Sequence, residues 1–100
     1  MKFEFIEPYE FEGKTYKELE IDFRKIDGSV IFAAEQEMRA SGVISPIITF
    51  NYRFCCAVLT QICAQPEEFF MRMPGPMVVE IVSQVQNFLN NSGLIRTLRA

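Results

Sequence analysis

The chain has 100 residues, 49% of them hydrophobic, and carries a formal net charge of −3 at pH 7. This length predicts one domain with a single hydrophobic core, and the acidic balance excludes a large basic surface for nucleic acid. The sequence contains no histidine, so the commonest general base and the commonest metal ligand are both missing.

Residues 1–25 alternate apolar and charged side chains with a period of two, which is typical of half-buried β-strands. Gly13 marks the turn between two such strands because glycine readily takes a positive φ. Pro8 has no backbone N–H, so we expect the first strand to be bent or interrupted there and to lie at an edge.

The register of this hairpin depends on the length of its loop. A two-residue turn sets Phe5 opposite Glu20 and mixes apolar with acidic side chains on one face. A loop of three or five residues pairs Phe3 with Phe23 and Phe5 with Ile21 on a common face. We expect the second register, because a slip of one residue moves every side chain to the other face.

The next segment predicts a helix from Asp27-Gly28-Ser29 to about Ser41. Asp27 is a suitable N-cap, and Gly42 offers a left-handed stop. Glu35 and Arg39 have the spacing and order of a favourable ion pair on the helix surface.

Residues 45–65 contain one charged residue, Arg53, and are apolar around about half of a helical circumference, which predicts a central helix. Its start has two alternatives: Ser45-Pro46 begins it directly, or residues 47–50 run extended and Asn51 is the cap. We expect a start near residue 50. The segment is too short and too interrupted to span a bilayer.

The remaining segments predict a short helix over 66–72 and an amphipathic helix from Pro76 to about Asn90. The two are separated by Met73-Pro74-Gly75-Pro76, which stops the first sharply. The residues that we expect to be nearly buried are Phe54, Val58, Leu59, Ile62, Val82, Val85 and Leu89.

Together these elements predict an α+β fold: an N-terminal antiparallel β-hairpin followed by a bundle of three to four helices. We expect one domain over residues 1–93, with the hairpin in 1–25 and the helical body in 27–91. Residues 94–100 are expected to form a short frayed tail.

The cysteines Cys55, Cys56 and Cys63 are odd in number and two are adjacent, which favours buried, reduced thiols in a cytoplasm. Adjacent cysteines on a helix point about 100° apart, so a tetrahedral metal site does not close. Lys2 is followed by alternating Phe and Glu, not by the apolar run of a secretory signal. We expect no catalytic residue, no cofactor and no metal.

The predicted short helix and the segment that follows it carry more large apolar side chains than can all face a single core. A wedge between two neighbouring helices accounts for such a group, and so does an adaptable surface that binds another protein. The candidate partner-binding residues are Phe69, Phe70, Met71, Met73 and Met77.

Four blocks of sequence occur in an order that resembles the small phage tail assembly chaperones: Gly13–Leu19, Ala33–Glu35, Arg39–Gly42 and Val85–Leu89. The resemblance covers about residues 5–91. It implies a non-enzymatic phage or prophage protein that binds the tape-measure protein in the host cytoplasm, keeps it soluble until the tail tube assembles, and is absent from the mature virion. We also expect the protein to self-associate when alone, and to bind neither nucleic acid nor membrane.

Two other classes of function stay open at the level of the sequence. A hairpin with helices also suits a small DNA-binding regulator of the winged-helix type, although the predicted helices carry few bases and no basic recognition face. A small enzyme is disfavoured because the sequence offers no histidine and no glycine-rich phosphate loop.

Overall fold

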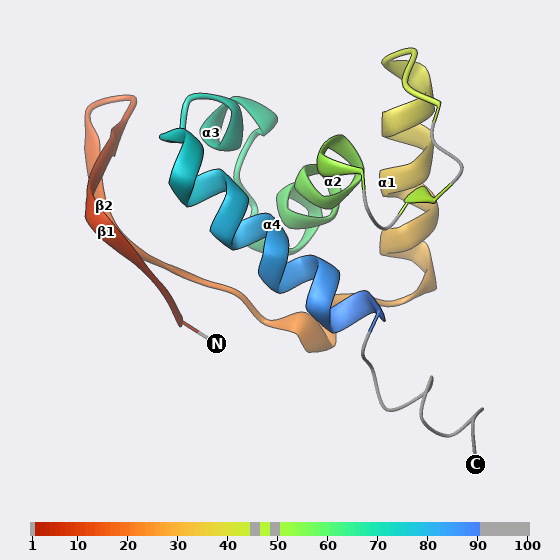
Figure 1. Cartoon of the computed structure of the whole chain (residues 1–100), viewed down its shortest axis with the longest axis horizontal. Helices are drawn as coiled ribbons and strands as arrows, with labels where there is room; N and C mark the ends of the chain where they lie inside the picture. The colour runs from red at the N-terminus through yellow and green to blue at the C-terminus, as the bar shows by residue number, and fades with distance from the viewer. Residues whose placement is uncertain (1, 45–46, 49–50, 91–100) are drawn as a thin grey trace.

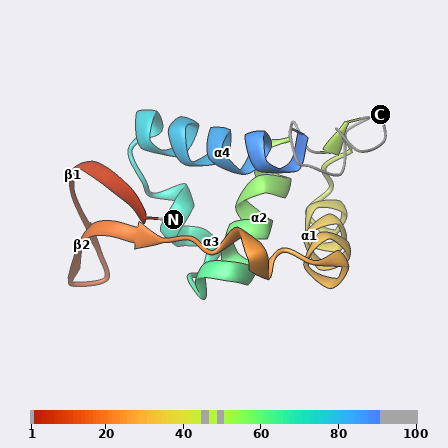
Figure 2. The same cartoon turned by 90° about the horizontal axis from the view of Figure 1, so that it is seen from below.

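The computed structural model describes residues 2–44, 47–48 and 51–90, and it has the predicted α+β architecture. In chain order, its elements are β1 (Lys2–Phe11), β2 (Lys14–Glu20), the 3₁₀ helix η1 (Phe23–Lys25), α1 (Gly28–Ala40), α2 (Tyr52–Cys63), α3 (Glu67–Met71) and α4 (Gly75–Asn90). The hairpin lies at one side of the molecule and α1 at the other (Figure 1), and α4 crosses between them over α2 and α3 (Figure 2).

The hairpin turns through two residues, Glu12 and Gly13, whose φ angles are +50° and +78°. Two successive positive φ values give the turn whose twist matches that of antiparallel strands. Next to the turn, Phe11 pairs with Lys14 and Tyr9 pairs with Tyr16. The expected loop of three or five residues is therefore wrong.

The predicted pairs, Phe3 with Phe23 and Phe5 with Ile21, are also wrong. Phe3 pairs with Leu19 instead. The register shifts between Glu4 and Tyr9, where β1 holds the four residues 5–8 and β2 has only residue 17. Such a bulge lets a two-residue turn coexist with an apolar inner face. Pro8 lies in this irregular part, where its missing N–H costs no ladder hydrogen bond.

The paired strands end at Glu20, earlier than the predicted limit of residue 25. Asp22 accepts a hydrogen bond from the Arg24 backbone N–H (3.0 Å) and caps η1, which contains Phe23. Ile21 is fully buried, and Phe23, the next apolar residue of the alternating pattern, is partly buried against the core.

Local capping sets the helix ends much as predicted. The side chains of Asp27 and Asn51 accept hydrogen bonds from the N–H groups of Val30 and Phe54, both at 3.1 Å. Gly42 has a φ of +86°, as its role as a stop requires. The earlier alternative start of α2 falls partly on residues 45–46 and 49–50, and the expected tail at 94–100 falls wholly outside the described residues.

The core lies between α2 and α4, with α1 packed against the other side of α2. Six of the seven residues predicted for it are buried, and Leu89 is only partly buried. Phe69 extends this core to the hairpin, since its ring meets those of Tyr9, Phe11 and Tyr16 edge-on at centroid distances of 5.0–5.3 Å. The Tyr9 hydroxyl also donates a 2.7 Å hydrogen bond to the Phe69 carbonyl.

Candidate functional site

The structure separates the five residues predicted to bind a partner. Phe69, Phe70, Met73 and Met77 are buried, with exposed fractions of 0–5%, whereas Met71 is 64% exposed. The expectation that these side chains are partly exposed at the surface is therefore wrong for four of the five. All four belong to the hydrophobic core. Their burial favours the other interpretation of the sequence, a wedge between two neighbouring helices, except that Phe69 also packs on the rings of the hairpin.

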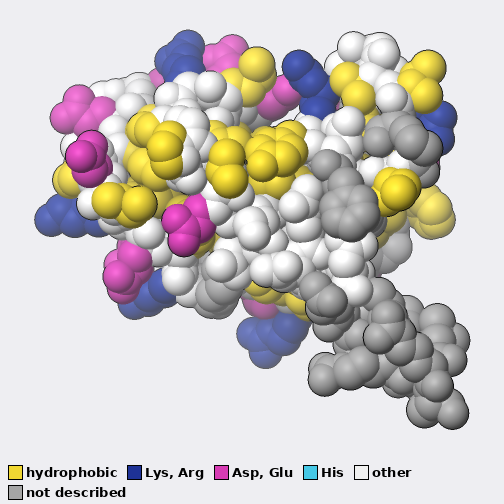
Figure 3. All heavy atoms as spheres, in the orientation of Figure 1, with side chains coloured by type: hydrophobic (Ala, Val, Ile, Leu, Met, Phe, Trp, Pro, Cys, Tyr) yellow, Lys and Arg dark blue, Asp and Glu magenta, His cyan; other side chains and the backbone are white. Residues whose placement is uncertain are grey.

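Met71 belongs to an open apolar groove of about 530 Å³ that lies where α2, α3 and the start of α4 meet. We refer to it as the α3 groove. Its lining residues are Tyr52, Arg53, Cys56, Glu67, Phe70, Met71, Met73, Gly75, Val78 and Val79. Figure 3 shows hydrophobic side chains gathered over these elements on one face of the molecule, with acidic side chains beside them.

Three large side chains of the α3 groove are open to solvent: Met71, Val79 (53% exposed) and Tyr52 (45% exposed). Phe70 and Met73, both buried, form part of its floor. Contiguous exposed apolar surface on a small protein commonly marks a site of protein–protein contact. Methionine suits such a site because its unbranched thioether side chain adapts to different partner surfaces.

Sequence reasoning missed Tyr52 and Val79, although the sequence contains a signal for the second. Val78, Val79, Ile81 and Val82 crowd the first half of α4, and four such neighbours span too wide an arc to face one core. Val82 and Ile81 point inward and are fully buried, which leaves Val79 outside. For Tyr52 the sequence gives no comparable signal.

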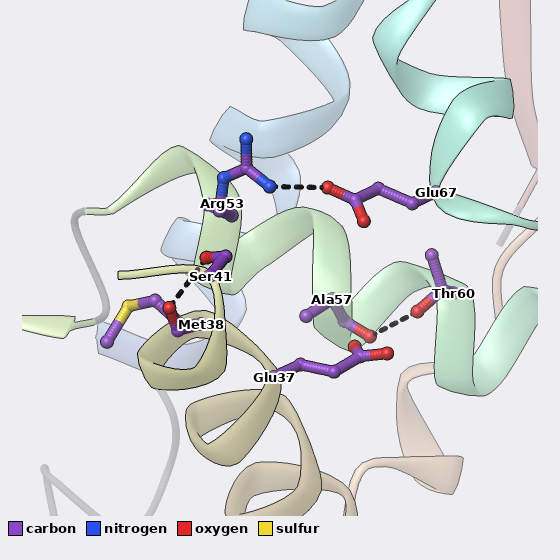
Figure 4. A pocket seen from close by; sticks show the side chains of 7 residues that line it. All are labelled: Glu37, Met38, Ser41, Arg53, Ala57, Thr60 and Glu67. Atoms are coloured by element: carbon purple, nitrogen blue, oxygen red, sulfur yellow. Dashed lines mark hydrogen bonds and ion pairs between the residues drawn. The ribbon is translucent and has the colours of Figure 1, made fainter. Parts of the chain in front are cut away.

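A second, smaller cavity of about 40 Å³ lies between α1, α2 and the start of α3 (Figure 4). Across its mouth, Arg53 donates a 2.8 Å hydrogen bond to Glu67. Its two hydroxyl groups donate to backbone carbonyls three residues earlier in the chain, Ser41 to Met38 and Thr60 to Ala57, both at 2.7 Å. Neither hydroxyl is therefore held by a carboxylate in the way that an activated nucleophile requires.

None of the three cysteines of α2 forms a disulfide bond with another described residue. Burial raises the pKa of Cys55 to about 12 and those of Cys56 and Cys63 to about 11. Near Cys56, the Glu67 carboxylate adds to this rise and Arg53 opposes it. Thiols with such pKa values are almost wholly protonated at neutral pH, so they are poor nucleophiles there.

Within residues 2–44, 47–48 and 51–90, no group of three or more potential ligand side chains is arranged to hold a metal ion. In the same part of the chain, no helix combines the length and the apolar character needed to cross a membrane.

In comparisons with known proteins, no family model, no curated protein and no solved structure matches this chain.

Proposed function

We propose that the protein is a phage tail assembly chaperone that binds the tape-measure protein during tail morphogenesis. The proposal combines the four sequence blocks that resemble this family with the α3 groove. On this proposal the protein acts in the host cytoplasm, has no catalytic role, and is released before the virion is complete.

The observation that carries the proposal is the exposed apolar lining of the α3 groove, with Met71, Val79 and Tyr52 open to solvent. A groove between helices, with an adaptable methionine at its edge, accepts the apolar face of an amphipathic helix. The tape-measure protein, as the resemblance implies, is a long chain with many such segments. Modest affinity at each groove and several chaperone copies along one client give a firm but reversible hold.

The direct test is co-expression with the tape-measure candidate encoded in the same gene cluster. We expect the amount of soluble client to depend on this protein. The variants Met71→Glu and Val79→Glu place a charge on the groove wall without touching the core, because both side chains are more than half exposed. Each is expected to abolish the rescue of the client. Substitutions at Phe70 or Met73 are unsuitable because both side chains are buried.

Phe32→Glu is the matched control, since Phe32 is 72% exposed on α1 and does not line the groove. It makes the same kind of change on another face of the molecule. All three variants should keep the wild-type circular dichroism spectrum and melting temperature. A client that stays soluble alone, or that is rescued equally by Val79→Glu and by the wild type, would contradict the proposal.

A further inference from the structure

The α3 groove is one part of a larger surface that continues around the start of α4. A neighbouring hollow is lined by Pro76, Val79, Glu80, Ser83 and Gln84 and shares Val79 with the groove. A further hollow is lined by Ile6, Glu7, Pro74, Pro76 and Met77 and shares Pro76 with the first. Ile6, on the bulge of β1, is 76% exposed. We refer to the groove and the two hollows together as the α4 shoulder.

The charges on the α4 shoulder are unbalanced. In the groove, Glu67 is neutralised by Arg53 at 2.8 Å, and beside it Glu68 is neutralised by Arg72 at 3.1 Å. In the two hollows, Glu7 and Glu80 are exposed. Neither of them forms an ion pair with any other described residue. The α4 shoulder is therefore an apolar surface with two uncompensated carboxylates at its outer border.

We infer that the client segment that fits this surface is an amphipathic helix whose apolar stripe is bordered by lysine or arginine. Apolar side chains one and two turns apart would enter the groove and the hollows, and bases beside the stripe would meet Glu7 and Glu80. Each exposed ion pair adds little affinity, but a helix bordered by acids meets like charge at both places. The border charges therefore select among apolar helices.

Within the described part of the chain, the four α-helices do not offer that chemistry, so the same helices of a second copy are poor occupants. The sequences of α3 and α4 contain no base. The single base of α1, Arg39, pairs with Glu35 at 3.1 Å, and the single base of α2, Arg53, pairs with Glu67. A foreign helix with unpaired bases matches the α4 shoulder better than any of these four.

The inference deepens the proposed function and rests on it for the identity of the client, but the chemistry can be tested with synthetic peptides. The probes are two peptides of about 15 residues, long enough for a helix to form on binding. They share one leucine stripe, which is bordered by lysine in one and by glutamate in the other. Affinity is measured by fluorescence anisotropy against the full chain at about 0.05 and about 0.5 M salt.

We expect the lysine-bordered peptide to bind about tenfold more tightly at low salt, with the difference shrinking at high salt. The double variant Glu7→Lys/Glu80→Lys should invert this preference. Glu10→Lys/Glu12→Lys is the matched control, because it changes the net charge by the same amount on exposed residues that do not line the α4 shoulder. It should keep the wild-type preference.

Equal affinity for the two peptides, or equal effects of the two double variants, would overturn the inference while leaving co-expression rescue as evidence for the chaperone. If the protein discriminates between the two peptides but does not keep the client soluble, the charge selectivity is supported and the tape-measure protein is not the client. The sequence of the tail, Leu94-Ile95-Arg96-Thr97-Leu98-Arg99, is itself apolar and basic. If Arg96→Glu/Arg99→Glu in the full chain raises peptide affinity about tenfold or more, the tail of this chain is the occupant and the inference is wrong.

Discussion

The hydrogen bond from the Tyr9 hydroxyl to the Phe69 carbonyl attaches the hairpin to α3, and a single substitution can remove it. The bond is 2.7 Å long and buried, and the two residues are 6% and 0% exposed. Phe69 lies in the last turn of α3, where carbonyl groups lack partners within the helix. The next N–H groups along the chain go elsewhere, that of Arg72 to Glu68 and that of Met73 to Phe70.

Tyr9→Phe removes the hydroxyl and keeps the ring, so the aromatic packing on Phe69 is preserved while the buried carbonyl loses its donor. Leaving one buried acceptor unsatisfied costs about 1–3 kcal/mol. In a domain of this size each kcal/mol lowers the melting temperature by about 4–8 °C. We therefore expect a fall of about 4–24 °C, measured by circular dichroism and checked by urea denaturation.

Tyr16→Phe is the control, since Tyr16 packs on the same Phe69 ring at 5.0 Å but is only partly buried. It should change the free energy of unfolding by less than about 0.5 kcal/mol. Equal losses in the two variants, or a loss below about 0.5 kcal/mol for Tyr9→Phe, would refute the claim that the hydroxyl fastens the hairpin to α3.

Four further predictions concern α2, the residue that follows it, and α4. Leu59→Ala should lower the free energy of unfolding by about 2–5 kcal/mol because Leu59 is fully buried. Leu89→Ala, at a partly buried site, should lower it clearly less. Equal losses in urea denaturation would show that the core is not centred where the structure places it. Ala64 ends α2 with a left-handed φ of +55°, so Ala64→Gly should raise the free energy of unfolding by about 0.5–1 kcal/mol, and a loss would show that the helix end is not strained. Burial raises the pKa of Cys55 to about 12, so its thiol should react with alkylating reagents at neutral pH only as fast as the protein unfolds. All three cysteines of α2 have raised pKa values, and unfolded thiols ionise near pH 8.5. Their contribution to stability should therefore be complete below that pH and fall as the pH rises toward 11–12; a urea midpoint that stays constant from pH 8 to 10 would contradict this.

The helices were predictable because their limits depend on near neighbours. Asp27 and Asn51 cap helices through N–H groups three residues ahead, and Gly42 stops α1 by its own φ. These contacts are contained in a few consecutive residues, so the sequence pattern is enough to place them.

The hairpin register was not predictable by the same route. The argument from alternation assumed an unbroken ladder, in which a two-residue turn sets Phe5 opposite an acid. The structure keeps the two-residue turn and absorbs the mismatch in residues 5–8. Pro8 signalled an interruption in the sequence, but how many residues it takes up depends on packing against α3 and α4 and is not a local property.

The prediction of the candidate site was partly wrong for a related reason. Phe69 looks surplus when only its own short helix is considered, yet three rings of the hairpin surround it. Met71 stays outside because it occupies the opposite side of the same helical turn. Which apolar residues are left exposed is set by contacts between distant segments, and these exist only in the folded chain.

The distance along the chain between Tyr9 and Phe69, 60 residues, has a consequence during translation. A hairpin pairs within about 1–10 μs, whereas a ribosome that adds about 5–20 residues per second needs about 3–12 s to supply the segment that covers it. Once β2 is complete at Glu20, the aromatic face of the nascent hairpin is open to neighbouring nascent chains for the rest of that interval. We expect the exposed glutamates of β1, such as Glu4 and Glu10, to hold such chains apart by repulsion. In cell-free synthesis, Glu4→Gln/Glu10→Gln should then increase the aggregated fraction on polysomes while leaving the melting temperature of the purified protein unchanged. Equal aggregation with and without these carboxylates would show that they do not protect the nascent hairpin.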